Sequence, residues 1–585
     1  MIIGLKEKLL KSEYPKLSRA LIILFGPLFP TTFLQFLINV TPIMFVGQLD
    51  KIQLDGVAFA VSVIHIFGTS VGYGLTYACD TLFSQAYGSA DKKKTGFYLQ
   101  KSLCISLLFP FPVAAVLLNV DHLLLLFGQD PRICEISSIY ISTYLPAFPV
   151  QYFYFILSRY LQNQDKTWPP LVAVLLGNIF NFTAQYLCLY KFNFTYQSSA
   201  ICMIITYLIM AIFNLTYLIT SKFYKPTWPG WTISALYNWD DFLRLAIPGI
   251  AYATFEQINW EAEIFMAGIM GIVPMAVHSV LSQTGTVTCP LYVAIGICAN
   301  VKIGQYLGAG QHERAKKIAQ ISIVAVVVLS LTIGSIISII REYWPLIFTT
   351  DKIVNEQVSK LIAFYPIYFV PESVNGVLSG IMRGCAKHSL TMYLAFGCMY
   401  LMGLPVAAML GFLAQLQVFG LWIGNTVGLS TLMIGYVISV WFFNWETLAL
   451  DAAHRLTRGQ YEDQNEIFEK NPLLITKPKE NEKANYPNGP YQLKHNRLPS
   501  QGITSSYDLI RTKKIIVFEN LRLKSKLNKN HKSIIIKRSV TLFVCLLMLF
   551  IGIIGRLSIR PDYNRYKAFV TDSKFNSTTE SMFVK

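Results

Sequence analysis

Two acidic residues stand inside apolar stretches of this 585-residue chain. Glu256 lies within residues 242–260, and Glu372 ends residues 362–372, and both stretches consist mainly of side chains that belong in hydrocarbon. An ionised carboxylate facing lipid costs about 3 kcal/mol or more. Acids at such positions usually bind protons or cations, so Glu256 and Glu372 are predicted to form a proton- or cation-binding site.

The helical period places further chemistry beside Glu256. Trp260 and Glu263 follow it at i+4 and i+7 and so share its face, whereas Glu261 lies roughly 140° away. Trp260 could add a cation-π contact to a protonated or quaternary amine. A water-facing carboxylate is the favoured interpretation of Glu263, near the outer end of its span, and solvation and function stay open for Glu261. Both remain candidate proton or cation sites.

Alternatives without transport chemistry exist for each acid. Glu256 could pair with a neighbouring amide and hold helices together, and Glu372, directly after Pro371, could belong to a proline bend that only packs. Because Pro366 also precedes it, we expect a kink whose freed carbonyls line a cavity. Asp80 lies near the cytoplasmic end of its span, where an acid is usually solvated.

Amides and histidines complete the set of polar residues inside the apolar runs. Asn178, Asn181 and Gln185, at spacings of three and four, form a stripe that lines the opposing wall of a cavity or bonds adjacent helices. His65 and His278 have no second histidine or cysteine at ligand spacing, so we expect core histidines, no metal site and no cofactor.

The composition defines the class of protein that must position these side chains. Hydrophobic residues make up 53% of the chain, charged residues 14%, and the mean hydropathy is +0.44, which is too apolar for a water-soluble protein of this size. We count twelve apolar runs between residues 21 and 443 that can cross roughly 30 Å of hydrocarbon, and one more at residues 540–554. The runs do not alternate, which excludes a membrane barrel. We therefore expect an all-α integral membrane protein with thirteen spanning helices.

The net charge of +17 is concentrated between the expected spans. Basic residues precede the first span, follow the second at Lys92–Lys94 and follow the eighth at Arg314, Lys316 and Lys317. All these clusters fall on one side of the membrane, which predicts a cytoplasmic amino terminus and an extracellular carboxyl terminus. A nucleic-acid partner is disfavoured because such loops are routinely basic. Asn193 and Asn576 lie in sequons on the expected external side and are candidate glycosylation sites.

The chain repeats itself at a nearly constant offset. Residues 24–27 match residues 245–248, and residues 84–89 match residues 304–309. We infer two six-helix bundles related by a pseudo-two-fold axis along the membrane normal, which face each other across a cavity. Gln35 then takes the place that Glu256 holds in the second half, and it is a candidate cavity residue.

The expected domains follow from these spans and from shifts in composition. Residues 445–538 are rich in Asn, Lys, Glu, Pro and Ser, so we expect a disordered basic cytoplasmic region, whose last part could lie on an anionic leaflet. The complete division is an amino-terminal lobe at 1–220, a cytoplasmic linker at 221–240, a carboxyl-terminal lobe at 241–444, the basic region at 445–538, the thirteenth helix at 539–557 and an extracellular tail at 558–585.

Several motifs give the chain a family resemblance. They are Leu243–Pro248, Glu256, Gly304–Gly310, Gly376 to Gly384, Gly403–Pro405, Ala78–Thr81 and Ser84–Gly88. Together they resemble the multidrug and toxic compound extrusion transporters over roughly residues 21–445. The added tail and thirteenth span are similar to the animal branch of that family, whose members exchange organic cations for protons at the plasma membrane.

The resemblance also implies roles for particular residues. Glu256, Glu261 and Glu372 match acids that are important for transport in the animal branch, and Asn178 with Asn181 matches its Asn-x-x-Asn pattern. Gln283 stands where animal relatives typically have glutamate, so the substrate range and the stoichiometry can differ. Gln283 is counted among the candidate cavity residues with Trp260.

The leading hypothesis is a secondary active antiporter that exports organic cations in exchange for protons by rocker-switch alternating access. Its expected partners are small organic cations, protons and membrane lipid, and we expect a monomer. A sodium-coupled antiporter and a lipid-linked precursor flippase of the wider superfamily stay open as transporter alternatives. A membrane-embedded enzyme would need a nucleophile and a base near one membrane face, and the sequence offers no such grouping. A receptor or scaffold gives no purpose to repeated six-span halves.

Overall fold

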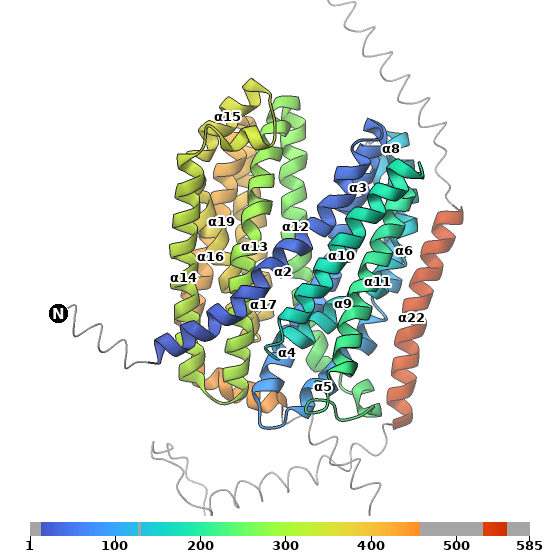
Figure 1. Cartoon of the computed structure of the whole chain (residues 1–585), viewed down its shortest axis with the longest axis vertical. Helices are drawn as coiled ribbons and strands as arrows, with labels where there is room; N and C mark the ends of the chain where they lie inside the picture. Colours follow the sequence, from blue (N-terminus) through green and yellow to red (C-terminus); the bar gives the residue numbers. More distant parts are fainter. Residues whose placement is uncertain (1–12, 127–129, 457–530, 559–585) are drawn as a thin grey trace, which may run out of the picture. The chain divides into compact units, whose positions relative to one another are not determined.

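The computed structural model describes residues 13–126, 130–456 and 531–558. Within these residues every regular element is a helix (Figure 1). Nine described helices are long and apolar enough to cross a membrane, or ten if α15 and α16 form one bent span. The all-helical membrane class agrees with the sequence, whereas the arrangement of twelve spans plus one stays a prediction. The expected extracellular tail, with Asn576, lies outside the described residues.

The helices of the first half have the following bounds. They are α2 (Tyr14–Val46), α3 (Lys51–Ile64), the π-helical turn η1 (His65–Thr69), α4 (Ser70–Gly88), α5 (Lys93–Ser106), α6 (Pro110–Leu117), α7 (Val120–Leu126), α8 (Pro131–Tyr144), α9 (Ala147–Gln162), α10 (Trp168–Tyr186), the π-helical turn η2 (Leu187–Lys191) and α11 (Gln197–Thr220).

The remaining helices follow the linker. They are η3 (Ile233–Leu236), α12 (Asp240–Met270), α13 (Ile272–Gly308), α14 (His312–Ile339), η4 (Trp344–Ile347), α15 (Lys352–Ile362), α16 (Tyr365–Gly384), α17 (His388–Ala395), η5 (Phe396–Gly403), α18 (Leu404–Ala408), η6 (Met409–Leu413), α19 (Gln417–Trp441) and α22 (His531–Ser558).

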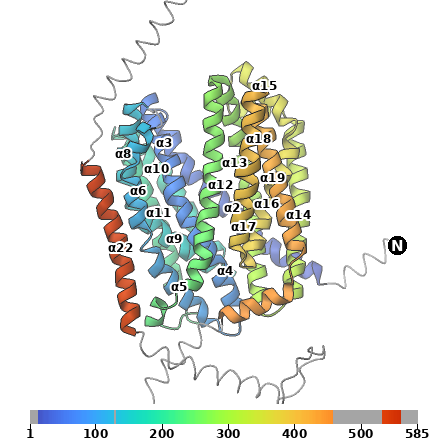
Figure 2. The same ribbon diagram turned by 180° about the vertical axis from the view of Figure 1, so that it is seen from behind.

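Two large hydrophobic cores organise residues 13–456. The first contains side chains from residues 38–246 together with Leu456, and the second contains side chains from residues 252–452 together with the amino-terminal part of α2. Figures 1 and 2 show α3, α8, α10 and α11 grouped on one side and α14, α16 and α19 on the other. The cores therefore divide near α12, close to the expected lobe boundary.

Helix α2 does not belong to one core alone. Leu17, Leu21 and Leu28 pack in the second core, whereas Ile38 and Val46 pack in the first. Figure 1 shows the same path, with α2 running from beside α14 to beside α10. The described part of residues 1–220 therefore does not pack as one lobe. The leucines in the first part of α2 are buried against the second core, whereas the rest of the helix packs on the first core.

Helix α12 also contributes to both cores, but its first residues pack in the first core and its later residues in the second. It packs along α4. Phe242 and Ala246 lie in the first core, and Tyr252 lies in the second. The backbones approach closely at Gly74, where an added Cβ would collide with the backbone of Ile250. Small residues allow such approach between membrane helices, so α4 and α12 form an intimate contact between the two cores.

Local structure recurs at the offset of the sequence repeat. Asp130 and Asp351 are equivalent under the repeat, and each caps a helix by accepting a hydrogen bond from a first-turn backbone N–H. Asp165 and Ala386, which are also equivalent, both adopt positive φ, at 61° and 60°. The two halves thus turn in the same way at equivalent points.

The expected kink near Glu372 lies before the helix that carries it. Helices α15 and α16 meet at an angle of 64° across a short break. Pro366 occupies the first turn of α16, where its missing N–H costs nothing, and Pro371 lies inside the helix. The break directs α16 toward the interior, and Glu372 lies two turns after it.

The linker and the start of the tail are both ordered. The amide of Gln100 on α5 donates to the carbonyl of Gly230 at 2.6 Å, which fastens the linker to the first half. Residues 445–456 are helical, so the expectation of disorder from residue 445 is wrong for this part. Its buried residues recur at helical spacing, a pattern that the average composition of the region conceals: Trp445, Leu448, Ala449, Ala452 and Leu456. Residues 457–530 lie outside the described residues.

Helix α22 is longer than the expected 539–557. It makes specific polar contacts with the first half (Figure 2). Arg556 forms an ion pair with Asp121 at 2.9 Å and also donates to the carbonyl of Leu118 at 2.8 Å. Asn119 donates to the carbonyl of Gly552, which lies against Ala115 of α6. The ion pair is unequal, because the side chain of Asp121 is 2% exposed and that of Arg556 is 31% exposed.

Replacing Arg556 with alanine should destabilise the folded protein by about 1 to 3 kcal/mol, because the buried Asp121 loses its partner and Arg556 is itself partly hydrated. Thermal unfolding in detergent measures the loss. Lys360→Ala is the matched control, since it removes a basic partner from an ion pair that is 74% and 69% exposed and should change little. Equal shifts in the two variants would contradict a specific contact of α22 with the first half.

Candidate functional site

Glu256 lies on α12 at the level where the two cores meet. Its side chain is exposed, although titratable groups from other helices surround it within electrostatic range. These groups are Tyr77 on α4, Cys289 on α13, Arg383 on α16 and Tyr436 on α19. Glu256 is thus exposed although titratable side chains from four other helices lie around it. Glu256 is therefore accessible and not sealed by packing.

Glu372 lies on α16 and is 6% exposed. The hydroxyl of Tyr292 on α13 donates to its Oε1 at 3.1 Å. Its Oε2 has no hydrogen-bond partner among the described residues, although the hydroxyl of Tyr368 lies close by. The carboxyl group therefore keeps one acceptor atom that a proton or a cation can occupy.

Glu263 is buried, so the expectation of a water-facing carboxylate is wrong. It is 2% exposed, and both oxygens accept amide hydrogen bonds at 2.9 Å, Oε1 from Asn259 and Oε2 from Asn425 on α19. Glu263 lies on the same face of α12 as Glu256, but at this level the face meets α19, which the depth in the span alone does not reveal. Buried acids require such partners.

The three carboxyl groups form a series. Glu372 lies within electrostatic range of Glu256 on one side and of Glu263 on the other. Tyr368 is near both Glu372 and Glu263. The series extends from the exposed Glu256 into the interior of the second core.

The remaining candidates on α12 and α13 lie around this series. Glu261 is half-buried and lies beside Ser62 of α3, so it faces the first half. The ring of Trp260 lies near Gly285 of α13, at 3.9 Å from an added Cβ. Gln283 is exposed. Trp260 and Glu261 therefore belong to different surroundings, as their helical spacing predicts.

The amide stripe on α10 joins helices. Asn178 donates to the carbonyl of Leu34 at 2.9 Å, and Asn181 donates to that of Ile38 at 3.2 Å, both on α2. Asn181 and Gln185 are fully buried, and Gln185 donates to the carbonyl of Ser199 on α11 at 3.2 Å, so of the two roles expected for the stripe these residues take the bonding one. Gln35 donates to the hydroxyl of Tyr154 at 3.2 Å and is half-buried.

Among the described residues, the histidines and cysteines do not gather into a metal-binding group. His278 is buried, and its Nε2 lies 3.2 Å from the hydroxyl of Ser282 one turn away. In the part of the chain that the structure describes, no three or more His, Cys, Asp or Glu side chains are placed to hold a metal ion.

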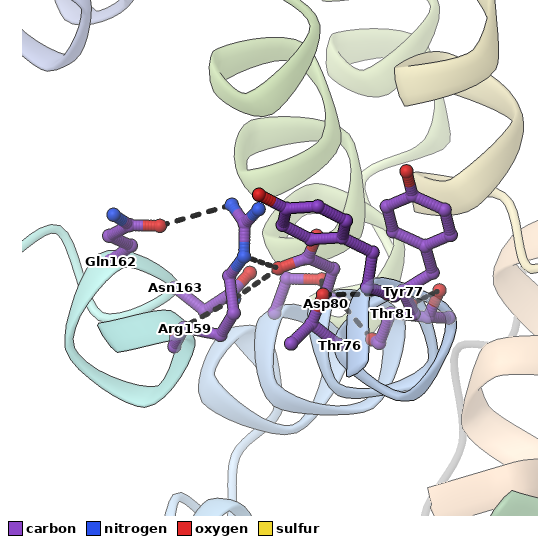
Figure 3. A network of polar contacts seen from close by, with 9 residues as sticks. Thr76, Tyr77, Asp80, Thr81, Arg159, Gln162 and Asn163 are labelled. Carbon is purple, nitrogen blue, oxygen red and sulfur yellow. Dashed lines mark hydrogen bonds and ion pairs between the residues drawn. The ribbon is translucent and has the colours of Figure 1, made fainter. Parts of the chain in front are cut away.

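Asp80 is 1% exposed, which contradicts the expectation of a solvated acid near the cytoplasmic end. Figure 3 shows its surroundings: Arg159 of α9 approaches Asp80 at 3.6 Å, and Asn163 donates to the same carboxylate at 3.1 Å. Arg159 also donates to the side-chain oxygen of Gln162 at 3.1 Å. Helices α4 and α9 are thus joined by a buried ion pair.

The ends of the two halves that the sequence predicts to be cytoplasmic are held together by a reciprocal pair of hydrogen bonds. Gln85 donates to the carbonyl of Gly384 at 3.0 Å, and Gln305 donates to the carbonyl of Asn163 at 3.0 Å. The two donors are equivalent under the sequence repeat, and so are the two acceptors. Gly88 and Gly308 make room for this contact, because an added Cβ would collide with the backbone of Gln305 and of Gln85 respectively.

Further polar contacts surround this pair, and we call the whole region, after the side on which the sequence places it, the cytoplasmic seal. Thr81 of α4 donates to the carbonyl of Arg383 at 2.6 Å and lies 2.9 Å from Nε2 of His388. Lys302 bonds both oxygens of Asp165 at 2.8 and 2.9 Å. The seal therefore combines backbone carbonyls from both halves, an ion pair between the halves and the hydroxyl of Thr81.

Charged residues near the helix ends add two further contacts, of which the first reaches the seal. Arg455 of the helix at 445–456 donates to Gln85 at 3.2 Å, and burial lowers the pKa of its guanidinium. Before α2, hydrogen bonds from Arg314 and Lys317 lower the pKa of Glu13 to about 2. Glu13 therefore stays ionised at physiological pH and ties the start of α2 to α14.

Several of these residues were not singled out from the sequence. Arg383 and Asn425 stand in apolar runs just as Glu256 does, so the signal that identified the acids was present for them too. Tyr292 and Tyr368 carry no such signal, because tyrosine is common in membrane helices. Their roles depend on which face of each helix meets Glu372.

The described helices and their buried carboxylates define a polytopic membrane protein with an interior polar site. The MatE family model matches residues 27–187 and 254–409, one segment in each half. The chain also resembles solved structures of MATE transporters. The eukaryotic transporter AtDTX14 aligns with a TM-score of 0.72 at 23% identity, over 76% of this chain and 100% of that structure. A mutant of the Vibrio cholerae transporter VcmN aligns with a TM-score of 0.68 at 15% identity, over 75% of this chain and 100% of that structure.

Animal relatives are similar in sequence over most of their length. Multidrug and toxin extrusion protein 2 of Pongo abelii is 33% identical over 443 residues, which cover 73% of this chain and 76% of the relative. The human multidrug and toxin extrusion protein 1 is 32% identical over 438 residues, covering 74% and 76%. The chain belongs to the multidrug and toxin extrusion family of membrane transporters, which confirms the resemblance found in the sequence.

Breaking either glutamine bond of the seal should favour separation of the two halves. Gln85→Leu or Gln305→Leu leaves a backbone carbonyl unpaired, which costs about 1 to 3 kcal/mol while the seal stays closed and shifts the ratio of open to closed molecules roughly 5- to 150-fold. Distances between spin labels at residues 222 and 312, with the reactive native cysteines removed, report the opening. Gln320→Leu is the control, since Gln320 accepts its hydrogen bond from the Tyr14 hydroxyl at an exposed site. If the distance distributions of the Gln85→Leu and Gln305→Leu variants equal that of the wild type, the two bonds do not hold the seal closed.

Proposed function

We propose that this chain is a secondary active antiporter that exports small organic cations in exchange for protons by rocker-switch alternating access. The observation that carries the proposal is the series Glu256, Glu372 and Glu263, whose outermost member is exposed between the two cores while the cytoplasmic ends are sealed. The names of the relatives, multidrug and toxin extrusion proteins, support the same class of cargo.

Competition for the carboxyl groups couples the two fluxes in this mechanism. Neighbouring carboxylates away from bulk water repel each other, and binding a proton or a cation relieves the repulsion. A proton from the acidic side and an organic cation from the other side then exclude each other at Glu256 and Glu372. Trp260 adds an aromatic surface nearby, which suits a protonated amine.

Rocking of two equivalent halves fits the construction of the seal. The bonds Gln85 to Gly384 and Gln305 to Asn163 exchange roles between the halves, which supports a pseudo-two-fold relation along the membrane normal. We propose that opening the seal, while the external ends close, exposes the acids to the cytoplasm.

The remaining features of the proposal follow from topology. We place the protein in the plasma membrane as a monomer surrounded by lipid, with a cytoplasmic amino terminus and an extracellular carboxyl terminus. Asn193, exposed in the loop after η2, and Asn576 would then lie on the glycosylated side. We assign it no enzymatic activity.

Replacing Glu256 with glutamine should reduce proton-driven transport at least tenfold, because the side chain can no longer exchange a proton for a cation. Reconstituted vesicles with an imposed proton gradient, supplied with tetraethylammonium as a model cation, measure the uptake. The external pH is varied in wild-type and variant protein, and the pH dependence should flatten in the variant.

Glu342→Gln is the matched control, because this acid is exposed outside the helices of the site and should leave uptake unchanged. A sodium gradient applied at constant pH is the second arm. If a sodium gradient alone drives uptake, sodium and not the proton is the coupling ion. If neither gradient drives uptake by the wild-type protein, the protein is not an antiporter.

A further inference from the structure

We propose that Arg383 is an internal competitor cation for Glu256: a specificity-determining residue that Tyr77 holds away from the carboxylate while the cytoplasmic seal is closed. This inference rests on the proposed function and deepens it. It assigns a role to a buried charge that the exchange of protons and organic cations does not otherwise use.

Arg383 is a buried cation with no carboxylate partner. Its residue is 8% exposed, and no described acidic side chain lies within ion-pair distance of its guanidinium. Its Nε is buried without a hydrogen-bond partner among the described residues. A buried guanidinium normally pairs, because desolvation without a partner is costly. Glu256 lies within electrostatic range but is not engaged.

The contact that holds Arg383 in place comes from the other half of the protein. The guanidinium carbon lies 4.4 Å from the ring centroid of Tyr77 on α4, a cation-π geometry. One turn further along α4, Thr81 donates to the backbone carbonyl of Arg383 at 2.6 Å. Figure 3 shows Tyr77 and Thr81 on the same helix. Helix α4 thus contacts Arg383 at both its backbone and its side chain.

The groups around Glu256 leave Arg383 as its only cationic neighbour among the described residues within electrostatic range. Tyr77 faces it from α4, Tyr252 from α12 itself, Tyr436 from α19, Cys289 from α13 and Glu372 from α16. None of these groups is a cation at physiological pH. A guanidinium released from Tyr77 therefore has Glu256 as its anionic partner within electrostatic range.

The sequence repeat places acid and cation together in one half only. At the offset that relates residues 24–27 to residues 245–248, Glu256 corresponds to Gln35 and Arg383 corresponds to Gln162. The first half carries two neutral amides where the second half carries an acid and a base. The two charges thus occur as a pair, as expected if they act on each other.

Opening of the seal would change the partner of Arg383. When α4 leaves α16, the Tyr77 and Thr81 contacts are lost together, and the guanidinium can turn to Glu256. The ion pair then expels the proton of Glu256 into cytoplasmic water, leaving a carboxylate from which an organic cation must displace Arg383. When the seal closes, Tyr77 takes the guanidinium back and Glu256 can accept the next proton.

The test compares cation uptake by reconstituted full-length variants, with tetraethylammonium as the probe. Arg383→Gln should lower KM about fivefold or more, because the competitor is gone, and should lower kcat because proton release slows. Arg383→Lys keeps the charge and should restore a KM near that of the wild type. Tyr77→Leu frees the guanidinium and should raise KM by a similar factor, whereas Tyr77→Phe keeps the ring and should not.

Lys387→Gln is the matched control, since it removes a positive charge one turn away at the cytoplasmic end. In a Glu256→Gln background, Arg383→Gln should produce no further change in KM. If Arg383→Gln and Lys387→Gln have the same KM while Glu256→Gln alters transport, this inference is wrong. The proposed function would then still stand. If Arg383→Gln does not fold, the two Tyr77 variants decide: equal KM values for Leu and Phe overturn this inference. If Glu256→Gln behaves as wild type, the proposed function itself fails.

Discussion

The cost of placing charge in a medium of low polarity is the constraint on which this structure depends. The acidic groups of the interior each have an identifiable partner or an open approach. Asp80 pairs with Arg159, and Glu263 accepts two amide hydrogen bonds. Glu372 has one hydroxyl donor, and Glu256 is left exposed. The order is informative, because the carboxyl groups with fewest fixed partners are those that can accept a transported ion.

The cytoplasmic seal depends largely on hydrogen bonds between neutral groups. A glutamine amide bonded to a carbonyl contributes only about 1 kcal/mol net, because water replaces the partner when the contact opens. The two reciprocal bonds, the close approach at Gly88 and Gly308 and the Lys302–Asp165 pair can therefore separate without leaving a stranded buried charge. Asp80 and Arg159, by contrast, lie within the first half and would move together. Under the proposed mechanism, the buried pair stays intact within the first half while the bonds between the halves break.

Much of the fold could be predicted from the sequence because the relevant signals are local. Apolar runs give the helical membrane class, the internal repeat gives equivalent caps at Asp130 and Asp351, and an acid in an apolar run marks Glu256 and Glu372. What failed depends on contacts between distant segments. Glu263 is buried because Asn425 reaches it from α19, Asp80 because α9 covers it, and residues 445–456 fold because their apolar side packs mainly on the second core. Depth in a span and average composition contain no information about such neighbours.

The backbone of this chain follows the internal repeat, whereas the charged side chains near its centre do not. The equivalent turns at Asp165 and Ala386 and the exchanged glutamine bonds indicate that the two halves share a backbone design. The charges near the centre do not follow that design, since Glu256, Glu372 and Arg383 all lie in the second half. A symmetric scaffold allows either end to open at similar cost, because equivalent contacts form and break. In the proposed exchange, an asymmetric set of charges would make the two openings chemically different, since only opening of the seal would change the partner of Arg383. Directional exchange requires both properties, and neither the repeat nor the acids supply it alone.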